Sequence, residues 1–142
     1  MSESTKALYR AINFITGSLG GNSYGGPIYG ELKMESMDRL VQVLIKHTNL
    51  SKNSRFLDVG SGLGKPNLHV AQSVKVELSI GIECVENRHK LSLTHLKKAL
   101  ELTLNVNGTS PVNTPNCYLV HGNICDAINL NPFTHVYMFD IG

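Results

Sequence analysis

The sequence predicts an α/β fold built on a parallel β-sheet, and three observations carry this prediction. Short apolar runs at 55–59, 78–83, 117–121 and 135–139 alternate with segments of helical pattern. The first run leads directly into a glycine-rich turn, and the second ends on Glu83. Strands that alternate with helices form βαβ units, in which the strands run parallel.

Two helices separated by a loop are expected before the first strand. Residues 4–16 and about 31–47 carry apolar side chains at helical spacing. Glycine recurs through residues 17–30, which breaks any regular element and indicates a loop. We therefore expect an N-terminal helical segment over 1–52 and an α/β core over 53–142.

Two further helices are expected after the first and second strands. Pro66 suits the first turn of a helix, where its missing N–H costs nothing, and this helix is expected to reach Ser73. A long helix is expected from Asn87 to about Val106, and Gly108 stops it. Its basic side chains are interpreted as a solvated outer face; they are Arg88, His89, Lys90, His95, Lys97 and Lys98.

The composition limits the number of domains and the classes of partner that the chain can have. A chain of 142 residues with 42% apolar residues makes one domain with one core. The net charge of +2 gives no electrostatic case for nucleic acid or an anionic membrane. No signal peptide and no membrane-spanning run is expected. Three cysteines without a C-x-x-C pair favour an intracellular compartment, and no metal site is expected.

The glycine turn carries the strongest chemical signal. The stretch DVGSGLG at residues 58–64 follows a strand and opens a helix, so its backbone can approach a ligand closely. The spacing is G-x-G-x-G rather than the G-x-G-x-x-G of dinucleotide folds. Asp58 would repel a pyrophosphate but can pair with the cationic amino-acid end of S-adenosylmethionine. The alternative interpretation is a turn that needs glycine only for its backbone conformation and binds no ligand.

The ends of the next two strands supply further candidates. Glu83 can accept both hydroxyls of a ribose, or it is a solvated charge at a strand end. After the third strand, Asn123 can meet the adenine amino group and Ile124 can pack on the ring. A plain turn is the alternative for these two residues.

Asp140 follows the fourth strand and is the catalytic candidate. Ligands of open α/β sheets bind at the carboxyl ends of the strands, so this position should face the transferred methyl. Asp140 would orient an incoming amine or take its proton, and a surface acid is the equal alternative. The stretch FDIG at 139–142 replaces the Pro-Pro-aromatic signature of adenine and cytosine amino-group methyltransferases, which argues against those substrates.

Three stretches give the chain a resemblance to a known family. IYGEL at 28–32, FLDVGSGLGK at 56–65 and GIE at 81–83 resemble loops of the disruptor-of-telomeric-silencing family of non-SET histone-lysine methyltransferases. The match spans about residues 24–142. It implies a Rossmann-like class I methyltransferase fold, S-adenosylmethionine as cofactor, a histone or nucleosome as protein substrate, and the nucleus as location.

The resemblance also implies roles for individual residues. Residues 29–32 would line and cap the methionine end of the cofactor, and residues 56–65 would wrap around the cofactor. Glu83 would hold the ribose, and Asn123 with Ile124 would hold the adenine. The cofactor-binding set is Tyr29, Gly30, Glu31, Leu32, Phe56, Asp58, Val59, Gly60, Ser61, Gly62, Leu63, Gly64, Lys65, Glu83, Asn123 and Ile124. Departures from the family pattern are Lys65 for glutamine, Asn123 for aspartate, and Asp140 for a frequent asparagine.

The resemblance leaves alternatives open. A complete class I methyltransferase sheet has seven strands, and four are expected here, so we expect an incomplete domain with an unpaired sheet edge. The acceptor is expected to be a histone lysine; the alternatives are another protein, a small molecule, or cofactor binding without catalysis. A nicotinamide-dependent oxidoreductase is disfavoured by Asp58 and the glycine spacing.

Overall fold

A computed structural model describes residues 1–16, 32–107 and 116–139 of the chain. In chain order the elements are α1 (Glu3–Thr16), α2 (Met34–Thr48), β1 (Arg55–Val59), α3 (Lys65–Ser73), β2 (Leu78–Glu83), α4 (Glu86–Asn107), β3 (Cys117–His121), a 3₁₀ turn η2 (Ile124–Asp126) and β4 (His135–Met138). The four strands form one sheet in the order β3-β2-β1-β4, and every pair is parallel. The predicted α/β fold with a parallel sheet is confirmed.

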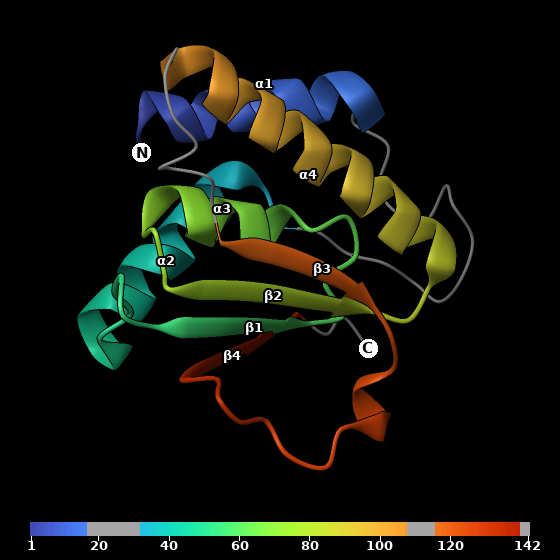
Figure 1. The fold of residues 1–142 in the computed structure, drawn as a ribbon. Helices are drawn as coiled ribbons and strands as arrows, with labels where there is room; N and C mark the ends of the chain where they lie inside the picture. The colour runs from blue at the N-terminus through green and yellow to red at the C-terminus, as the bar shows by residue number, and fades with distance from the viewer. Residues whose placement is uncertain (17–31, 108–115, 140–142) are drawn as a thin grey trace.

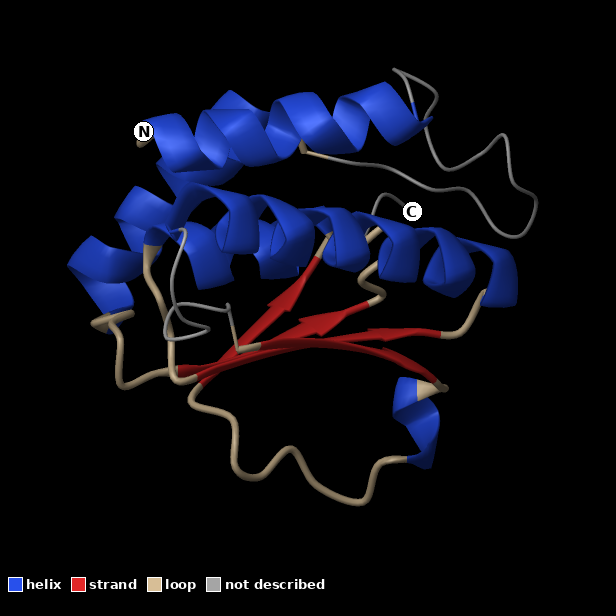
Figure 2. Ribbon diagram, turned by 45° about the horizontal axis from the view of Figure 1, so that its top comes forward, coloured by secondary structure: helices blue, strands red, loops and turns tan. Residues whose placement is uncertain are grey.

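The helices lie on one face of this sheet (Figure 1). α3 contacts β1, β2 and β3, whereas α4 contacts β2 and β3. α1 packs on α3 and α4 as an outer layer, and α2 packs beside α3. Figure 2 shows the other face, which only the segment from η2 to β4 crosses within the described part of the chain. None of the described helices is long and apolar enough to span a bilayer.

Two clusters of buried side chains hold the layers together. The first joins α1, α3, α4 and β3 through Leu8, Ile12, Leu68, Ala71, Ala99, Cys117 and Leu119. The second joins α2, β1 and α3 through Met37, Val41, Leu50, Phe56, Val70 and Val76. Because α3 contributes to both clusters, its position on the sheet is fixed from two sides. The turn that precedes α3 is fixed with it.

The prediction that the basic side chains of α4 form a solvated outer face is wrong for two of them. Arg88 is 4% exposed and His95 is fully buried. The reason is that α4 lies between α1 and the sheet, so it has two buried sides and no single solvent stripe. His95 lies on the side that meets the turn between β1 and α3.

The second face of the sheet is apolar and largely open. Strand alternation and register place two cross-strand rows there, Tyr118–Ile80–Leu57–Val136 and Val120–Ile82–Val59–Met138. The residues on the outer strands are the most exposed, with Tyr118 at 57% and Met138 at 63%. Parallel sheets are normally covered on both faces. Within the described residues, this face therefore leaves apolar side chains exposed where a parallel sheet is normally covered.

Candidate functional site

The turn between β1 and α3 depends on glycine for its shape. Gly60, Gly62 and Gly64 have φ values of +74°, +54° and +80°. Side chains with a Cβ rarely adopt this left-handed conformation. At Gly64 space is also short, because a Cβ would lie 2.8 Å from Cδ1 of Leu119. The alternating glycines therefore set both the path of the turn and its close approach to β3.

Backbone hydrogen bonds fasten this turn to the end of β2. The amides of Gly60 and Ser61 both donate to the carbonyl of Ile82, at 2.9 and 3.0 Å. The amide of Gly64 donates to the carbonyl of Ser61 at 2.8 Å. Gly81 of β2 lies directly beneath, since a Cβ there would be 2.6 Å from Cβ of Ser61. Gly81, the glycine of the GIE stretch, is therefore required because a larger side chain would collide with the turn.

Glu83 is part of the same unit. Its carboxylate is 4% exposed, and Oε2 accepts the amide of Gly62 at 2.8 Å while Oε1 accepts the amide of Val85 at 2.8 Å. Each carboxylate oxygen has two acceptor positions, so one position on each oxygen is left for a further donor. The predicted ribose contact remains a prediction, and it would add to an existing structural role.

Asp58 is a buried carboxylate next to the turn. It is 2% exposed, and its Oδ2 has no hydrogen-bond partner within residues 1–16, 32–107 and 116–139. Burial, and secondly the negative charge of Glu83, raise the pKa of Asp58 to about 7. An unpaired buried carboxylate is costly unless a cation or a donor meets it. This oxygen fits the ammonium group of an amino-acid ligand.

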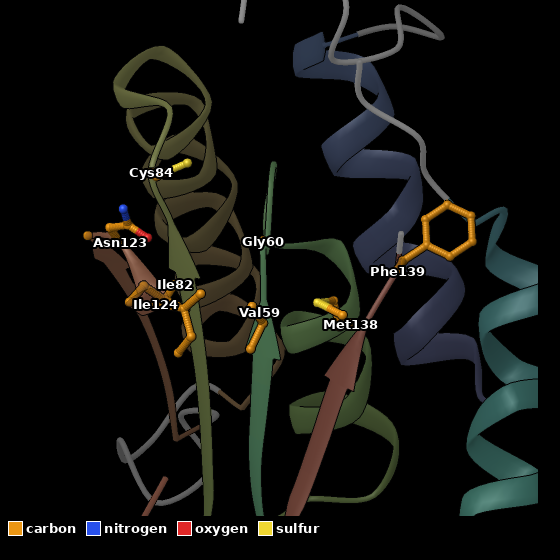
Figure 3. A pocket seen from close by; sticks show the side chains of 9 residues that line it. Val59, Gly60, Ile82, Cys84, Asn123, Ile124, Met138 and Phe139 are labelled. Atoms are coloured by element: carbon orange, nitrogen blue, oxygen red, sulfur yellow. The ribbon is translucent and has the colours of Figure 1, made fainter. Parts of the chain in front are cut away.

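A hollow of about 240 Å³ lies at the carboxyl ends of the strands. Figure 3 shows its walls: Asn123 and Ile124 stand on the side of β3, and Met138 and Phe139 stand on the side of β4. The ends of β1 and β2 lie between these walls. The full lining is Val59, Gly60, Ile82, Cys84, Gly122, Asn123, Ile124, Met138 and Phe139. Such an apolar hollow with a few polar groups suits the planar ring of a small molecule.

Asn123, in the wall of this hollow, is the N-cap residue of η2. Its Oδ1 accepts the amide of Cys125 at 3.0 Å and caps the short helix η2. Oδ1 keeps a second acceptor position, and the amide nitrogen donates. The side chain could therefore accept from the adenine amino group or donate to a ring nitrogen, and the predicted adenine contact stays a prediction.

The structure divides the predicted binding residues into groups. Val59, Gly60, Asn123 and Ile124 line the hollow. Asp58 and Glu83, with Ser61, Gly62 and Gly64, form the turn beside it, and Lys65 opens α3.

Other predicted residues lie in the interior. Phe56 is fully buried at the second position of β1 and stacks on Tyr137 with ring centroids 6.2 Å apart. Leu63 is fully buried, and Leu32 packs against the cluster that contains Phe56. Phe56 and Leu32 lie inside because they pack in the cluster that joins α2, β1 and α3. The predicted residues Tyr29, Gly30, Glu31 and Asp140 lie outside the described residues.

Sequence reasoning missed several residues that line the hollow. Ile82 and Met138 occupy strand ends next to the predicted Val59 in the register of the sheet. The rule that ligands bind at carboxyl ends of strands would have found them. No group of metal-ligating side chains occurs in the part of the chain that the structure describes.

Comparison with known sequences gives two matches. A family model described as "Histone methylation protein DOT1" matches residues 22–121. A Drosophila melanogaster protein named "Histone-lysine N-methyltransferase, H3 lysine-79 specific" is 43% identical over 56 residues. That alignment covers 39% of this chain and 3% of the Drosophila protein.

Comparison with solved structures gives the predicted fold, that of class I methyltransferases. Magnesium protoporphyrin IX methyltransferase from Synechocystis, solved with bound S-adenosylhomocysteine, has a TM-score of 0.54 at 16% identity, over 98% of this chain and 54% of that one. A candidate protein-L-isoaspartate O-methyltransferase from Plasmodium falciparum, in complex with S-adenosyl-L-homocysteine, has a TM-score of 0.53 at 19% identity, over 88% and 57% of the two chains. The chain thus spans about half of each of these structures.

Proposed function

Because this chain belongs to the histone methylation protein DOT1 family, we propose that it binds S-adenosylmethionine and directs its methyl group to a lysine of a histone. The observation that carries the proposal is the buried Oδ2 of Asp58 beside the glycine turn, which has no hydrogen-bond partner among the described residues. The ammonium group of the cofactor would compensate this carboxylate. The nucleus is the corresponding location.

The described residues suit the separate parts of this cofactor. Asp58 would pair with the amino group, and the second acceptor positions of Glu83 would take the ribose hydroxyls. Ile82 and Ile124 would pack on the adenine in the hollow, and the amide nitrogen of Asn123 would donate to a ring nitrogen. Residues 29–31 are proposed, from the resemblance alone, to cover the methionine end.

When bound, S-adenosylmethionine supplies a methyl group on a cationic sulfur, and transfer is an in-line displacement. The protein therefore has to align the acceptor amine, exclude water and accept a proton. Asp140 follows Phe139, which lies in the wall of the hollow. We assign Asp140 the role of orienting the lysine amine or taking its proton.

Titration calorimetry with the purified chain tests the cofactor. Saturable binding of S-adenosylmethionine, no binding of NAD, and a loss of affinity in Asp58→Asn are expected. Glu35→Gln, which changes an exposed carboxyl on α2, is the matched control and should bind like the wild type. A folded chain that does not bind S-adenosylmethionine would overturn the proposal.

The acceptor is tested separately in the longest natural protein that contains this chain. Transfer of labelled methyl groups to nucleosomes or histones, and its loss in Asp140→Ala with cofactor binding retained, are expected. Transfer to other proteins or free amines alone would reject the histone substrate. Binding without any transfer would leave a cofactor-binding module.

A further inference from the structure

The helix α4 presents two polar side chains to the glycine turn. Ser92 is 1% exposed and His95 is fully buried, and the two are three residues apart on one face of the helix. A Cβ on Gly64 would lie 3.5 Å from Cβ of Ser92, so the small serine lets the helix come close to the turn. Neither residue belongs to the binding set inferred from the sequence.

His95 holds one peptide group of the turn. Its Nδ1 lies 2.9 Å from the carbonyl oxygen of Leu63. A carbonyl oxygen only accepts, so Nδ1 carries the proton and donates this hydrogen bond. The ring reaches the turn across 32 positions of the chain, from an element that follows β2.

The orientation of this peptide group matters because glycines flank Leu63. Gly62 and Gly64 both have positive φ, and glycine adopts positive and negative φ almost equally well. The peptide group that joins Leu63 to Gly64 turns through ψ of Leu63 and φ of Gly64, and the glycine lowers the cost of this rotation unless the polar groups of the peptide are held. The amide of Gly62 is held by Glu83 and that of Gly64 by Ser61. The carbonyl of Leu63 and the amide of Gly64 belong to one peptide group, and the hydrogen bond from His95 holds its carbonyl side while Ser61 holds its amide side.

We propose that His95 is a positioning residue for cofactor binding, which keeps the glycine turn in its binding shape before the ligand arrives. The inference rests on the proposed function, since it assumes that this turn receives S-adenosylmethionine. Ordering a loop in advance removes part of the cost of binding. Without the hydrogen bond, the turn would sample other peptide orientations and would have to be ordered at each binding event.

His69 offers a matched control inside the same molecule. It is also fully buried, and its Nδ1 also takes part in a hydrogen bond of 2.9 Å, but the partner is the hydroxyl of Tyr9 on α1. Replacing either histidine by leucine removes a buried ring together with the hydrogen bond of its Nδ1, and at His69 it also removes the contact of Nε2 with Asp38 at 3.6 Å. Only the change at His95 acts on the turn directly.

The test compares His95→Leu, His95→Asn and His69→Leu in the full chain. The amide nitrogen of asparagine branches from Cγ as Nδ1 of histidine does, so His95→Asn keeps a donor close to Leu63. Affinity for S-adenosylmethionine is measured by calorimetry and stability by urea unfolding. We expect His95→Leu to weaken binding roughly tenfold, from the loss of one buried hydrogen bond. His95→Asn should recover most of the affinity, and His69→Leu should lose stability but little affinity.

A second measurement needs no ligand. Hydrogen exchange at the amides of residues 62–64 should be faster in His95→Leu than in His95→Asn. Equal losses of affinity in His95→Leu and His69→Leu, or unchanged exchange in His95→Leu, would overturn the inference. If the wild type fails to bind S-adenosylmethionine, the proposed function fails, and the exchange measurement still decides whether His95 holds the turn.

Discussion

The carboxylate of Glu83 accepts the backbone amide of Gly62 at 2.8 Å, and this bond joins the end of β2 to the glycine turn. The same carboxylate accepts the amide of Val85 through its other oxygen. The acidic residue at this strand end therefore has a structural role in the ligand-free protein, and its contact with a ligand stays a prediction.

Glu83→Gln is expected to destabilise the protein by about 1–3 kcal/mol, because glutamine offers one oxygen where the amides of Gly62 and Val85, in a buried and a partly buried bond, each need an acceptor. Urea unfolding measures the loss. Glu101→Gln removes an exposed carboxylate on α4 and should stay within about 0.5 kcal/mol of the wild type. A stable Glu83→Gln variant that still loses cofactor affinity would instead assign Glu83 to the ligand alone.

Asp58→Asn is expected to change how stability depends on pH. The pKa of Asp58 is raised from its ordinary value of 3.8 to about 7 in the folded protein. The folded state then binds the proton more tightly, so the free energy of unfolding falls as pH rises from about 4 to about 7. Asparagine removes this contribution, worth up to roughly 4 kcal/mol. Urea unfolding at pH 5 and pH 8 should show a smaller fall in the variant, and parallel curves would contradict the pKa shift.

Asn123→Asp distinguishes two contacts with adenine. Aspartate keeps an oxygen for the amide of Cys125, so the cap of η2 survives, but it loses the donor. If Asn123 donates to a ring nitrogen, affinity for S-adenosylmethionine should fall by roughly five- to tenfold. Tighter binding in calorimetry would show that an acceptor for the adenine amino group is what the site needs.

Gly81→Ala tests the packing of the turn on β2. The added methyl would lie 2.5 Å from Oδ1 of Asn67 and 2.6 Å from Cβ of Ser61, both buried. We expect a loss of about 1–3 kcal/mol in unfolding free energy. Gly122→Ala is the control for stability, because its methyl would meet only Ile82, at 3.4 Å. Equal stability of both variants would contradict the tight contact at Gly81.

The open face of the sheet is expected to cause self-association of the isolated chain. Tyr118→Lys with Met138→Lys places charges on the two outer strands and should raise the monomer fraction in analytical ultracentrifugation. Phe14→Lys on α1 is the control, because Phe14 is 89% exposed but lies away from the sheet. If this control is equally effective, general surface hydrophobicity and not the sheet face drives association.

The strands and the glycine turn could be predicted from the sequence because local patterns determine them. β1, β2 and β3 begin and end at the predicted residues, β4 is one residue shorter than expected, and α2 begins at Met34 rather than near residue 31. The burial of His95 could not be predicted, since it depends on α4 being enclosed between α1 and the sheet.

The end of β4 could be predicted to lie at the ligand edge of the sheet, but the position of Met138 beside Val59 could not. It follows from β4 pairing with β1, and no local pattern reveals the order of strands. The interior position of Phe56 depends on its packing with α2 and α3 and on its contact with Tyr137, 81 positions further along the chain.

The order β3-β2-β1-β4 also fixes how far apart the two sides of the ligand hollow lie. The two walls of the hollow stand on the outermost strands, and hydrogen-bonded strands are spaced by about 4.8 Å. Backbone pairing therefore fixes the separation between the backbones of the two walls, and the side chains of the walls decide how much of that separation is open. Smaller wall side chains should admit a bulkier ring without any change in the pairing of the strands.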